Sequence, residues 1–341
     1  MKKKILVTGG LGFIGSHTSL KLLENNYEII ILDNLSNSKI EVINRIKNLA
    51  KKEFEFIKGD VRDRSLLRKL FKKYVIDSVI HFAGLKAAGE SEKYPLDYYD
   101  NNVIGSLVLF QEMKIANIKS IIFSSSASVY GNAPTIKCKE ETKLNPISVY
   151  GKTKLIIEDI LKNLYKSQPE WKIINLRYFN PIGAHCSGLI GESPSGTANN
   201  IFPLILDAAV GNLKKLSVFG NDWPTPDGTP IRDYIHVMDL AEAHIRALEF
   251  LVSKEPRCID LNIGTGAGTS VLELIRIFEE SNKIKIPFKF SPRRLGDVQY
   301  LVADNELALN TLNWKPKNTI RDMCKDGWKW KKLNPSGYTK E

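Results

Sequence analysis

The chain has 341 residues, of which 43% are hydrophobic and 26% are charged, a composition typical of a globular protein and not of a disordered one. This length predicts about two domains, and the longest conspicuous aliphatic run, 29–32, is far shorter than the ~20 residues that cross a bilayer. The formal charge is +11, but the lysines are interspersed with acids, as in Lys51-Lys52-Glu53, so we expect a solvated basic surface with no nucleic-acid or membrane partner.

Short apolar segments alternate with helical patterns through the first half of the chain. Strands are predicted at 4–7, 28–32, 54–57, 78–82, 120–123 and 172–176, with helical patterns between them, for example at 16–23 and 65–70. Continuous apolar strands separated by helices are typical of a parallel sheet that is covered on both faces. The predicted fold class is therefore α/β, a doubly wound parallel (Rossmann) sheet with a smaller C-terminal lobe.

The composition changes after Asn180. Residues 181–200 and 221–230 are rich in Gly, Ser, Pro and Asn, which favours irregular segments that line a site. We therefore predict a nucleotide-binding domain over 1–180 and a substrate lobe over 181–341, with segment 232–260 packing back on the first domain.

The four cysteines do not pair at metal-ligand spacing, and the five histidines do not cluster with them. The cysteines are Cys138, Cys186, Cys258 and Cys324. We expect no metal, and the simplest interpretation is a reduced cytoplasmic protein.

A glycine-rich turn directly follows the first predicted strand and opens the first helix. Gly9, Gly12 and Gly15 permit a tight turn, and they let backbone N–H groups approach a pyrophosphate at the start of a helix. The second strand ends at Asp33, where a carboxylate accepts hydrogen bonds from an adenosine ribose and repels a 2′-phosphate. The pattern predicts NAD, not NADP. Asp60 and Val61 follow the third strand and 82–84 the fourth, at the edge where such sheets bind ligands.

Tyr150 and Lys154 are four residues apart at the start of a predicted helix and therefore share one face. A free tyrosine has a pKa of about 10, and an ammonium about 5 Å away, together with the positive nicotinamide ring, lowers it enough for the phenol to act as a base. Ser126 belongs to a serine run just beyond a strand, from which it can hydrogen-bond a reacting oxygen. These three residues are the predicted catalytic set.

The glycine turn, the serine run and Tyr-x-x-x-Lys together resemble the extended short-chain dehydrogenases/reductases, and within them the UDP-hexose 4-epimerases. The similarity extends from Ile5 to about Trp330 and includes His81-Phe82-Ala83-Gly84-Leu85-Lys86, Leu176-Arg177-Tyr178-Phe179-Asn180-Pro181 and Arg232-Asp233-Tyr234-Ile235-His236-Val237-Met238-Asp239-Leu240. The resemblance implies inversion of C4 of a UDP-sugar through a transient 4-keto sugar, with NAD retained through turnover. It also implies a homodimer that pairs through segments 101–116 and 152–167.

The resemblance assigns further contacts residue by residue. Cofactor contacts would be Gly9, Gly12, Phe13, Ile14, Gly15, Asp33, Asn34, Asn37, Ser38, Asp60, Val61, Phe82, Ala83, Gly84, Lys86, Asn101, Ser124, Tyr150, Lys154 and Phe179. Substrate contacts would be Ser126, Asn180, Asn200, Ile201, Ser217, Phe219, Arg232, Tyr234, Arg294, Asp297 and Leu301. Arg232 and Arg294 suit the diphosphate, because a guanidinium fork matches its paired oxygens.

Three residues depart from the family pattern. Pro230 stands where glycine is usual, Val149 where proline is common, and Leu301 where glucose/galactose-only enzymes carry a tyrosine. Small residues at the last position accompany enzymes that also accept N-acetylated sugars. Because leucine is smaller than tyrosine, we expect some room for an N-acetyl group, although Leu301 also fits a plain packing role.

Other functions compete with 4-epimerisation of UDP-glucose. UDP-N-acetylglucosamine is an alternative main substrate. A 4,6-dehydratase would place an acid pair at the serine run, where Ser124-Ser125-Ser126-Ala127 offers no carboxylate. A dehydrogenase would release reduced cofactor, and a non-catalytic NAD-binding scaffold would not need the tyrosine and the lysine.

Overall fold

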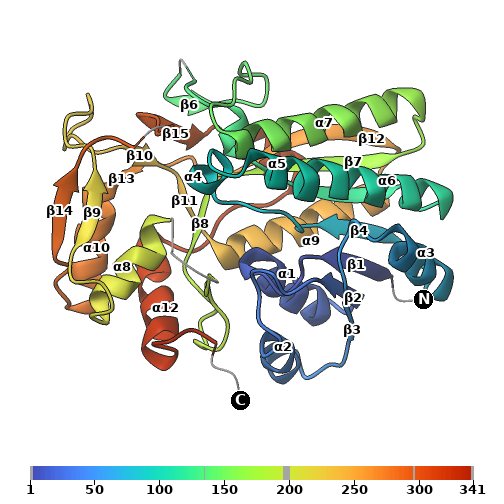
Figure 1. Ribbon diagram of the computed structural model, residues 1–341, viewed down its shortest axis with the longest axis horizontal. Helices are drawn as coiled ribbons and strands as arrows, with labels where there is room; N and C mark the ends of the chain where they lie inside the picture. The colour runs from blue at the N-terminus through green and yellow to red at the C-terminus, as the bar shows by residue number, and fades with distance from the viewer. Residues whose placement is uncertain (1–2, 134, 195–199, 295, 339–341) are drawn as a thin grey trace.

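The computed structural model describes residues 3–133, 135–194, 200–294 and 296–338, and its centre is a seven-stranded sheet (Figure 1). The strand order is β12-β7-β5-β4-β1-β2-β3, and every neighbouring pair is parallel. The strands are β1 (Lys4–Thr8), β2 (Glu28–Asp33), β3 (Glu55–Lys58), β4 (Ser78–His81), β5 (Ser120–Ser126), β7 (Lys172–Tyr178) and β12 (Arg257–Ile263). All seven carboxyl ends therefore meet at one edge, where a doubly wound sheet binds its ligand.

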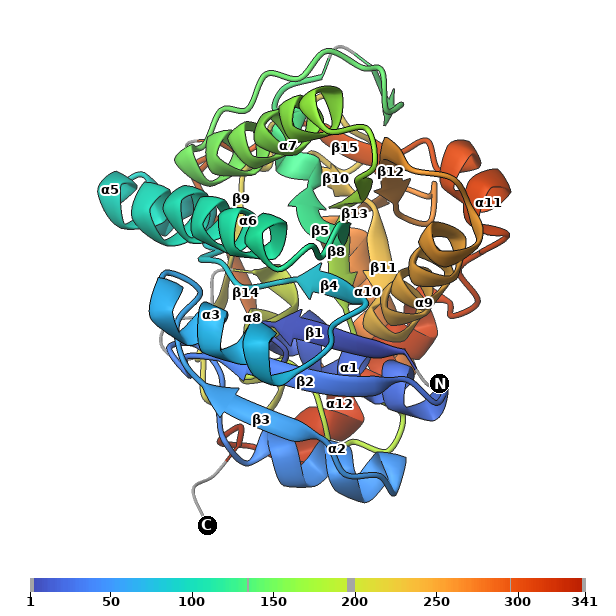
Figure 2. The ribbon, with the colours of Figure 1, turned by 90° about the vertical axis from the view of Figure 1, so that its right-hand side faces the viewer.

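Helices cover both faces of this sheet (Figure 2). One face carries α3 (Arg64–Lys73), α6 (Gly105–Ile115) and α7 (Val149–Ser167), and the other carries α1 (Phe13–Glu24), α2 (Val42–Ala50), α9 (Val237–Ser253) and α11 (Glu306–Leu312). Alternate strand residues supply the two cores, so that Ile5 and Val7 face one layer while Leu6 faces the other. Burial on both faces explains the continuous apolar strands.

Shorter elements follow β4 and β5 along the chain and pack against α7. They are α4 (Ala88–Ser91), α5 (Pro95–Tyr98), the π-helix η1 (Tyr99–Ile104) and the 3₁₀ turn η2 (Ala127–Val129).

The remaining elements form the smaller lobe, on the left in Figure 1. Its small sheets follow the orders β13-β10-β15-β6, β11-β8 and β14-β9. Their strands are β6 (Lys137–Cys138), β8 (Asn180–Ile182), β9 (Leu216–Phe219), β10 (Ile231–Arg232), β11 (Tyr234–His236), β13 (Thr269–Ser270), β14 (Phe288–Ser291) and β15 (Tyr300–Ala303). The helices α8 (Ile201–Ala209), α10 (Val271–Asn282) and α12 (Ile320–Leu333) enclose a third core.

The predicted fold class and all six predicted strands are confirmed. Two strands run further than their apolar patterns suggest, because β5 continues through Ser126 and β7 through Tyr178. The chain after residue 180 returns to the large sheet, since β12 pairs with β7 and α9 packs in the core beside α1. The domain division at residue 180 stays a prediction. None of the helices in the described ranges is long and apolar enough to cross a membrane.

Candidate active site

The glycine turn joins β1 to α1 at the carboxyl edge of the sheet. Gly9 has a φ of +67°, and a Cβ there would lie 2.7 Å from the backbone nitrogen of Ala83. A Cβ on Gly15 would lie 2.2 Å from the carbonyl oxygen of Gly9. Only glycine fits either position, so the turn stays tight and the N–H groups at the start of α1 remain available to an anion. The turn is a cradle of the shape that a dinucleotide pyrophosphate requires.

Asp33 ties the end of β2 to this turn. Its carboxylate accepts the Leu11 N–H at 3.0 Å, the Leu35 N–H at 2.9 Å and the Ser38 hydroxyl at 2.8 Å. The side chain is therefore fixed beside the glycine turn, where an adenosine ribose would lie. Behind it, Asn34 donates to Asp60 at 2.9 Å, so the ends of β2 and β3 are joined as well.

The catalytic helix α7 begins one residue before Tyr150. Ser148 caps it by accepting the Gly151 N–H at 3.0 Å, which starts regular helix early enough to place Tyr150 and Lys154 on successive turns of one face. The Lys154 ammonium donates to the carbonyl oxygen of Ser124 at 2.6 Å. Ser126 hydrogen-bonds the Tyr150 phenol. The structure therefore brings the three predicted catalytic residues together at the end of β5.

The electrostatics differ from the sequence expectation in one respect. Lys154 Nζ lies 5.8 Å from the centre of the Tyr150 ring, near the expected separation. However, burial raises the pKa of Tyr150, and the hydrogen bond from Ser126 only partly opposes this. Burial also lowers the pKa of Lys154 to about 7, against the attraction of Glu158. Because desolvation disfavours both charged forms, the lysine alone does not ionise the phenol, and the additional charge of an oxidised nicotinamide is needed.

A second cluster of predicted residues lies in the lobe and carries the arginines. The Arg294 guanidinium donates to Asp297 at 3.0 Å and lies 5.6 Å from the centre of the Phe219 ring. Arg232 lies 3.7 Å from the same carboxylate, and its pKa is lowered because its guanidinium is buried. One buried guanidinium, Arg232, and one exposed guanidinium, Arg294, share a single carboxylate, and the net positive charge of the three groups favours an anionic ligand.

Two buried polar atoms beside this cluster have no hydrogen-bond partner among the described residues. Asn180 and Tyr234 are register neighbours across β8 and β11. The side-chain oxygen of Asn180 and the hydroxyl of Tyr234 are buried, and neither has a hydrogen-bond partner within the described ranges. Buried polar groups are rarely left unpaired, so both atoms fit contacts to a bound polar ligand such as a nucleotide sugar.

The other predicted residues fall into two groups. Phe13, Ile14, Asn37, Val61, Phe82, Gly84 and Asn101 lie on the segments that leave the carboxyl edge, while Lys86 forms an ion pair of 2.6 Å with Glu192. Phe179 and Leu301 pack in one apolar cluster around Ala127. Asn200 directly precedes α8 without a side-chain capping hydrogen bond, Ile201 begins the helix and Ser217 lies in β9. In the described part of the chain, no hydrogen bond links Asn200 or Ser217 to the arginine cluster.

A buried pair next to the catalytic set, Tyr178 and His244, was not predicted from the sequence. The Tyr178 hydroxyl donates to His244 Nε2, because His244 Nδ1 is committed to the Leu240 carbonyl oxygen at 2.8 Å. Tyr178 also hydrogen-bonds Ser124. The sequence offered one signal for Tyr178. It stands directly before Phe179 and Asn180, at the end of a strand that neighbours the strand of the serine run.

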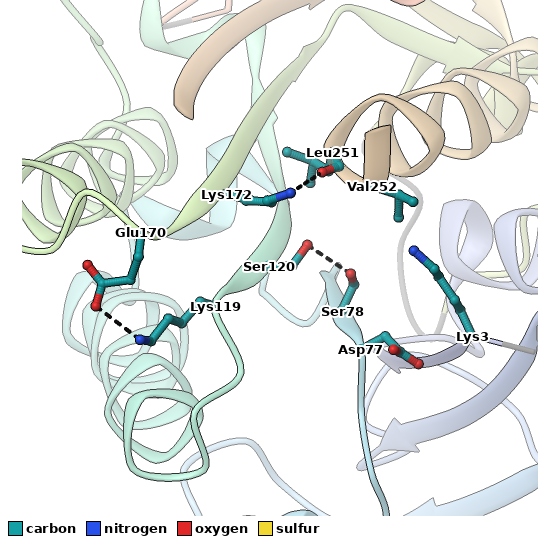
Figure 3. A pocket seen from close by; sticks show the side chains of 9 residues that line it. All are labelled: Lys3, Asp77, Ser78, Lys119, Ser120, Glu170, Lys172, Leu251 and Val252. Atoms are coloured by element: carbon teal, nitrogen blue, oxygen red, sulfur yellow. Dashed lines mark hydrogen bonds and ion pairs between the residues drawn. The ribbon is translucent and has the colours of Figure 1, made fainter. Parts of the chain in front are cut away.

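A hollow of about 270 Å³ lies elsewhere, at the amino ends of the strands (Figure 3). Its charged groups are largely satisfied by protein partners, since Lys119 pairs with Glu170 at 3.0 Å and Lys172 donates to Leu251 at 3.1 Å. Ligands of parallel α/β sheets bind at the opposite edge. This hollow is therefore not the active site.

A serine, a tyrosine and a lysine that meet at the carboxyl edge of a dinucleotide-binding sheet define an enzyme of the short-chain dehydrogenase/reductase class. The family profile described as GDP-mannose 4,6 dehydratase matches residues 6–327. The chain is 51% identical to the UDP-glucose 4-epimerase GEPI48 of Cyamopsis tetragonoloba, over 98% of this chain and 96% of that one. It is 50% identical to the UDP-glucose 4-epimerase of Neisseria meningitidis serogroup C, over 98% and 99% of the two chains. The chain belongs to the UDP-glucose 4-epimerase family within the extended short-chain dehydrogenases/reductases.

The solved structures agree with this assignment. The crystal structure of UDP-glucose 4-epimerase from Bifidobacterium longum in complex with NAD⁺ and UDP has a TM-score of 0.96 to this chain at 44% sequence identity. The match covers 98% of this chain and 100% of that one.

Proposed function

We propose that this chain inverts C4 of a UDP-hexose, interconverting UDP-glucose and UDP-galactose with NAD bound throughout. The observation that carries the proposal is the meeting of Tyr150, Lys154 and Ser126 at the end of β5, where the lysine and the tyrosine are each hydrogen-bonded to a residue of the same serine run. That run contains no carboxylate, so it lacks the acid that elimination of water requires. This favours epimerisation over 4,6-dehydration, although the matching family profile is described by a dehydratase.

Bound NAD would take hydride from C4 of the sugar and return it to the opposite face. Tyr150 accepts the proton of the 4-hydroxyl, and Ser126 hydrogen-bonds both the phenol and the reacting oxygen. Lys154 places a positive charge beside the phenol and would also hold the nicotinamide ribose. The glycine turn and Asp33 hold the adenosine half of the cofactor.

The arginine cluster would hold the diphosphate of the substrate. Arg232 and Arg294 present guanidinium groups to one side of the lobe, and such groups bind paired oxygens in two-point contacts. The unpartnered Asn180 oxygen and Tyr234 hydroxyl are available to the ligand beside them. Phe219 offers a ring face to the uracil base.

The test is incubation of the holoenzyme with UDP-galactose, followed by separation of the sugar products. Absorbance at the reduced-cofactor band is recorded throughout. We expect UDP-glucose to form without accumulation of reduced cofactor. Steady release of NADH would instead identify a dehydrogenase, a 4-keto-6-deoxy product would identify a dehydratase, and no reaction would support a scaffold.

Acceptance of N-acetylated sugars is a finer part of the proposal. Leu301 is partly buried and packs against the cluster that contains Ala127 and Phe179, so it borders the end of the serine run. A tyrosine there would occupy more of the space beside the sugar 2-position. We expect the native chain to turn over UDP-N-acetylglucosamine and Leu301→Tyr to lose that activity while it keeps UDP-galactose turnover. Equal, negligible rates with UDP-N-acetylglucosamine in the native chain and in Leu301→Tyr would refute the claim that Leu301 leaves room for an N-acetyl group.

We also propose that two copies pair through the outer surfaces of segments 101–116 and 152–167, together with the neighbouring helix α5. Leu96 is 80% exposed, Ile104 46% and Ile115 67%, and apolar exposure of this extent on neighbouring elements favours a protein interface. Sedimentation should give a dimer mass for the native chain and a monomer mass for Ile104→Lys.

The four cysteines are free thiols, which supports a cytoplasmic location.

A further inference from the structure

Glu158 continues the face of α7 that carries the catalytic residues. Tyr150, Lys154 and Glu158 follow one another at intervals of four residues and lie on successive turns of the helix. The Glu158 side chain is 0% exposed. A carboxylate in such a place is retained only if charged or hydrogen-bonding groups compensate for its lost hydration.

Its partners come from two neighbouring strands of the sheet. The Ser125 hydroxyl donates to Oε1 at 2.6 Å. The Arg177 guanidinium donates from Nε to Oε1 at 3.0 Å and from Nη2 to Oε2 at 2.7 Å, a two-point contact. Ser125 and Arg177 are register partners across β5 and β7, so one carboxylate docks the catalytic helix on both strands.

The contact with Ser125 falls between two residues of the site. The Ser124 carbonyl oxygen accepts the Lys154 ammonium at 2.6 Å, and the Ser126 hydroxyl bonds the Tyr150 phenol. Because Ser125 joins these two residues, its hydrogen bond to Glu158 fixes the backbone that presents both. The charge of Glu158 also acts directly on Lys154, one helical turn away, and opposes the loss of its proton.

Titratable groups from β4, β7 and β12, besides those of α7, surround Lys154 and Glu158, and the Cys258 thiol on β12 is one of those that face Glu158. Lys154 faces Tyr150 on its own helix, His81 on β4 and Glu158, while Tyr178 on β7 faces Tyr150. Arg177, Lys162 and Asp260 surround Glu158 from the far side. The two acids, Glu158 and Asp260, balance Arg177 and Lys162, so neutralising Glu158 leaves one uncompensated positive charge near Lys154.

We propose that Glu158 is a positioning residue for the epimerisation: through Ser125 it fixes the serine run, and through its charge it keeps Lys154 an ammonium ion. This inference rests on the proposed function. A residue that only docked the helix would contribute to stability and leave the protonation of the site unchanged.

Glu158→Gln removes the charge and keeps the size and one acceptor oxygen. Removing a nearby negative charge makes proton loss easier, so the pH profile of kcat should move to lower pH by about half a unit or more, with the plateau of kcat reduced and KM for UDP-galactose little changed. Glu158→Asp keeps the charge and should restore the native profile. Ser125→Ala keeps the charge and removes the tether, so it should lower kcat without moving the profile.

The matched control is Glu112→Gln. Glu112 is also a buried carboxylate, 1% exposed, held by Arg64 and Arg68 on a different helix pair. Its substitution should lower the thermal unfolding midpoint and leave the pH profile in place. An NMR titration of labelled lysine side chains, with Lys154→Met to assign the signal, should show the Lys154 midpoint lower in Glu158→Gln than in the native chain.

The outcomes separate this inference from the proposed function. A native chain that does not epimerise UDP-galactose refutes both. Native activity together with an unmoved profile and an unmoved Lys154 midpoint in Glu158→Gln refutes the charge role alone. An unchanged kcat in Ser125→Ala refutes the claim that the hydrogen bond between Ser125 and Glu158 fixes the serine run. This variant tests that claim even where Glu158→Gln does not fold.

Discussion

Acid should destabilise this protein through buried neutral histidines, and His81 offers the sharpest case. It is 1% exposed at the end of β4. Because the Ser106 hydroxyl donates to the Asn102 carbonyl oxygen, His81 Nε2 donates to Ser106 at 2.9 Å and Nδ1 accepts the Thr8 hydroxyl at 2.7 Å. Both ring nitrogens are therefore committed in the neutral form, and burial lowers the pKa of His81 to about 3.

The sign and size of the effect follow from proton linkage. In the unfolded chain this pKa returns to about 6.5, so the contribution of His81 is full above about pH 6.5 and is lost as the pH falls toward the folded value. Between about pH 7.5 and about pH 5, protonation of His81 in the unfolded chain therefore lowers the free energy of unfolding by about 2 kcal/mol. His17 and His244, whose pKa values burial lowers to about 3 and about 4, should each lose a similar amount.

His81→Gln tests this value, since the amide keeps one donor and one acceptor but does not titrate. The free energy of unfolding is measured by urea denaturation, followed by tryptophan fluorescence, at both pH values and a fixed excess of NAD. On acidification, the free energy of unfolding of the native chain should fall by about 2 kcal/mol more than that of the variant. The half-buried His185, substituted in the same way, should give a smaller difference. Equal losses in the native chain and His81→Gln would refute the reasoning.

Two further predictions concern the cofactor site. Gly15→Ala should abolish NAD retention, because its Cβ would lie 2.2 Å from the Gly9 carbonyl oxygen. Gly89→Ala should retain NAD in the same dialysis and absorbance measurement, because a Cβ there would meet no described residue within 4 Å outside its own helix and its chain neighbours. Asp33→Ser should narrow the preference for NAD over NADP, since it removes the charge that repels a 2′-phosphate. Direct titration with both dinucleotides checks this, and an unchanged affinity ratio would show that Asp33 does not face the ribose.

The sheet was predictable because its strands are buried on both faces and bounded by turns. Strand β1 needs only an apolar run closed by glycines, and the same pattern identifies the turn that follows it. The ends of β5 and β7 were underestimated, since Ser124 and Arg177 are polar and propensity does not favour them in a strand. Their hydrogen bonds come from residues that are distant in the sequence, which a local pattern does not contain.

The catalytic set was predictable because the spacing of Tyr150 and Lys154 is local to one helix. The supporting contacts were not, since Glu158 meets Arg177 only after β7 pairs with β5. The effect of burial on the pKa of Tyr150 was also beyond the sequence, because it depends on how closely the surrounding elements pack.

Turnover by Tyr150→Phe is the most direct test of the proton transfer on which the account depends. The variant lacks only the phenol oxygen, so NAD bound per chain, measured after denaturation, should equal that of the native chain. Conversion of UDP-galactose to UDP-glucose should fall by about a hundredfold to ten-thousandfold, the contribution of a positioned acid–base group. Native turnover in a variant that still holds its cofactor would mean that another group takes the proton.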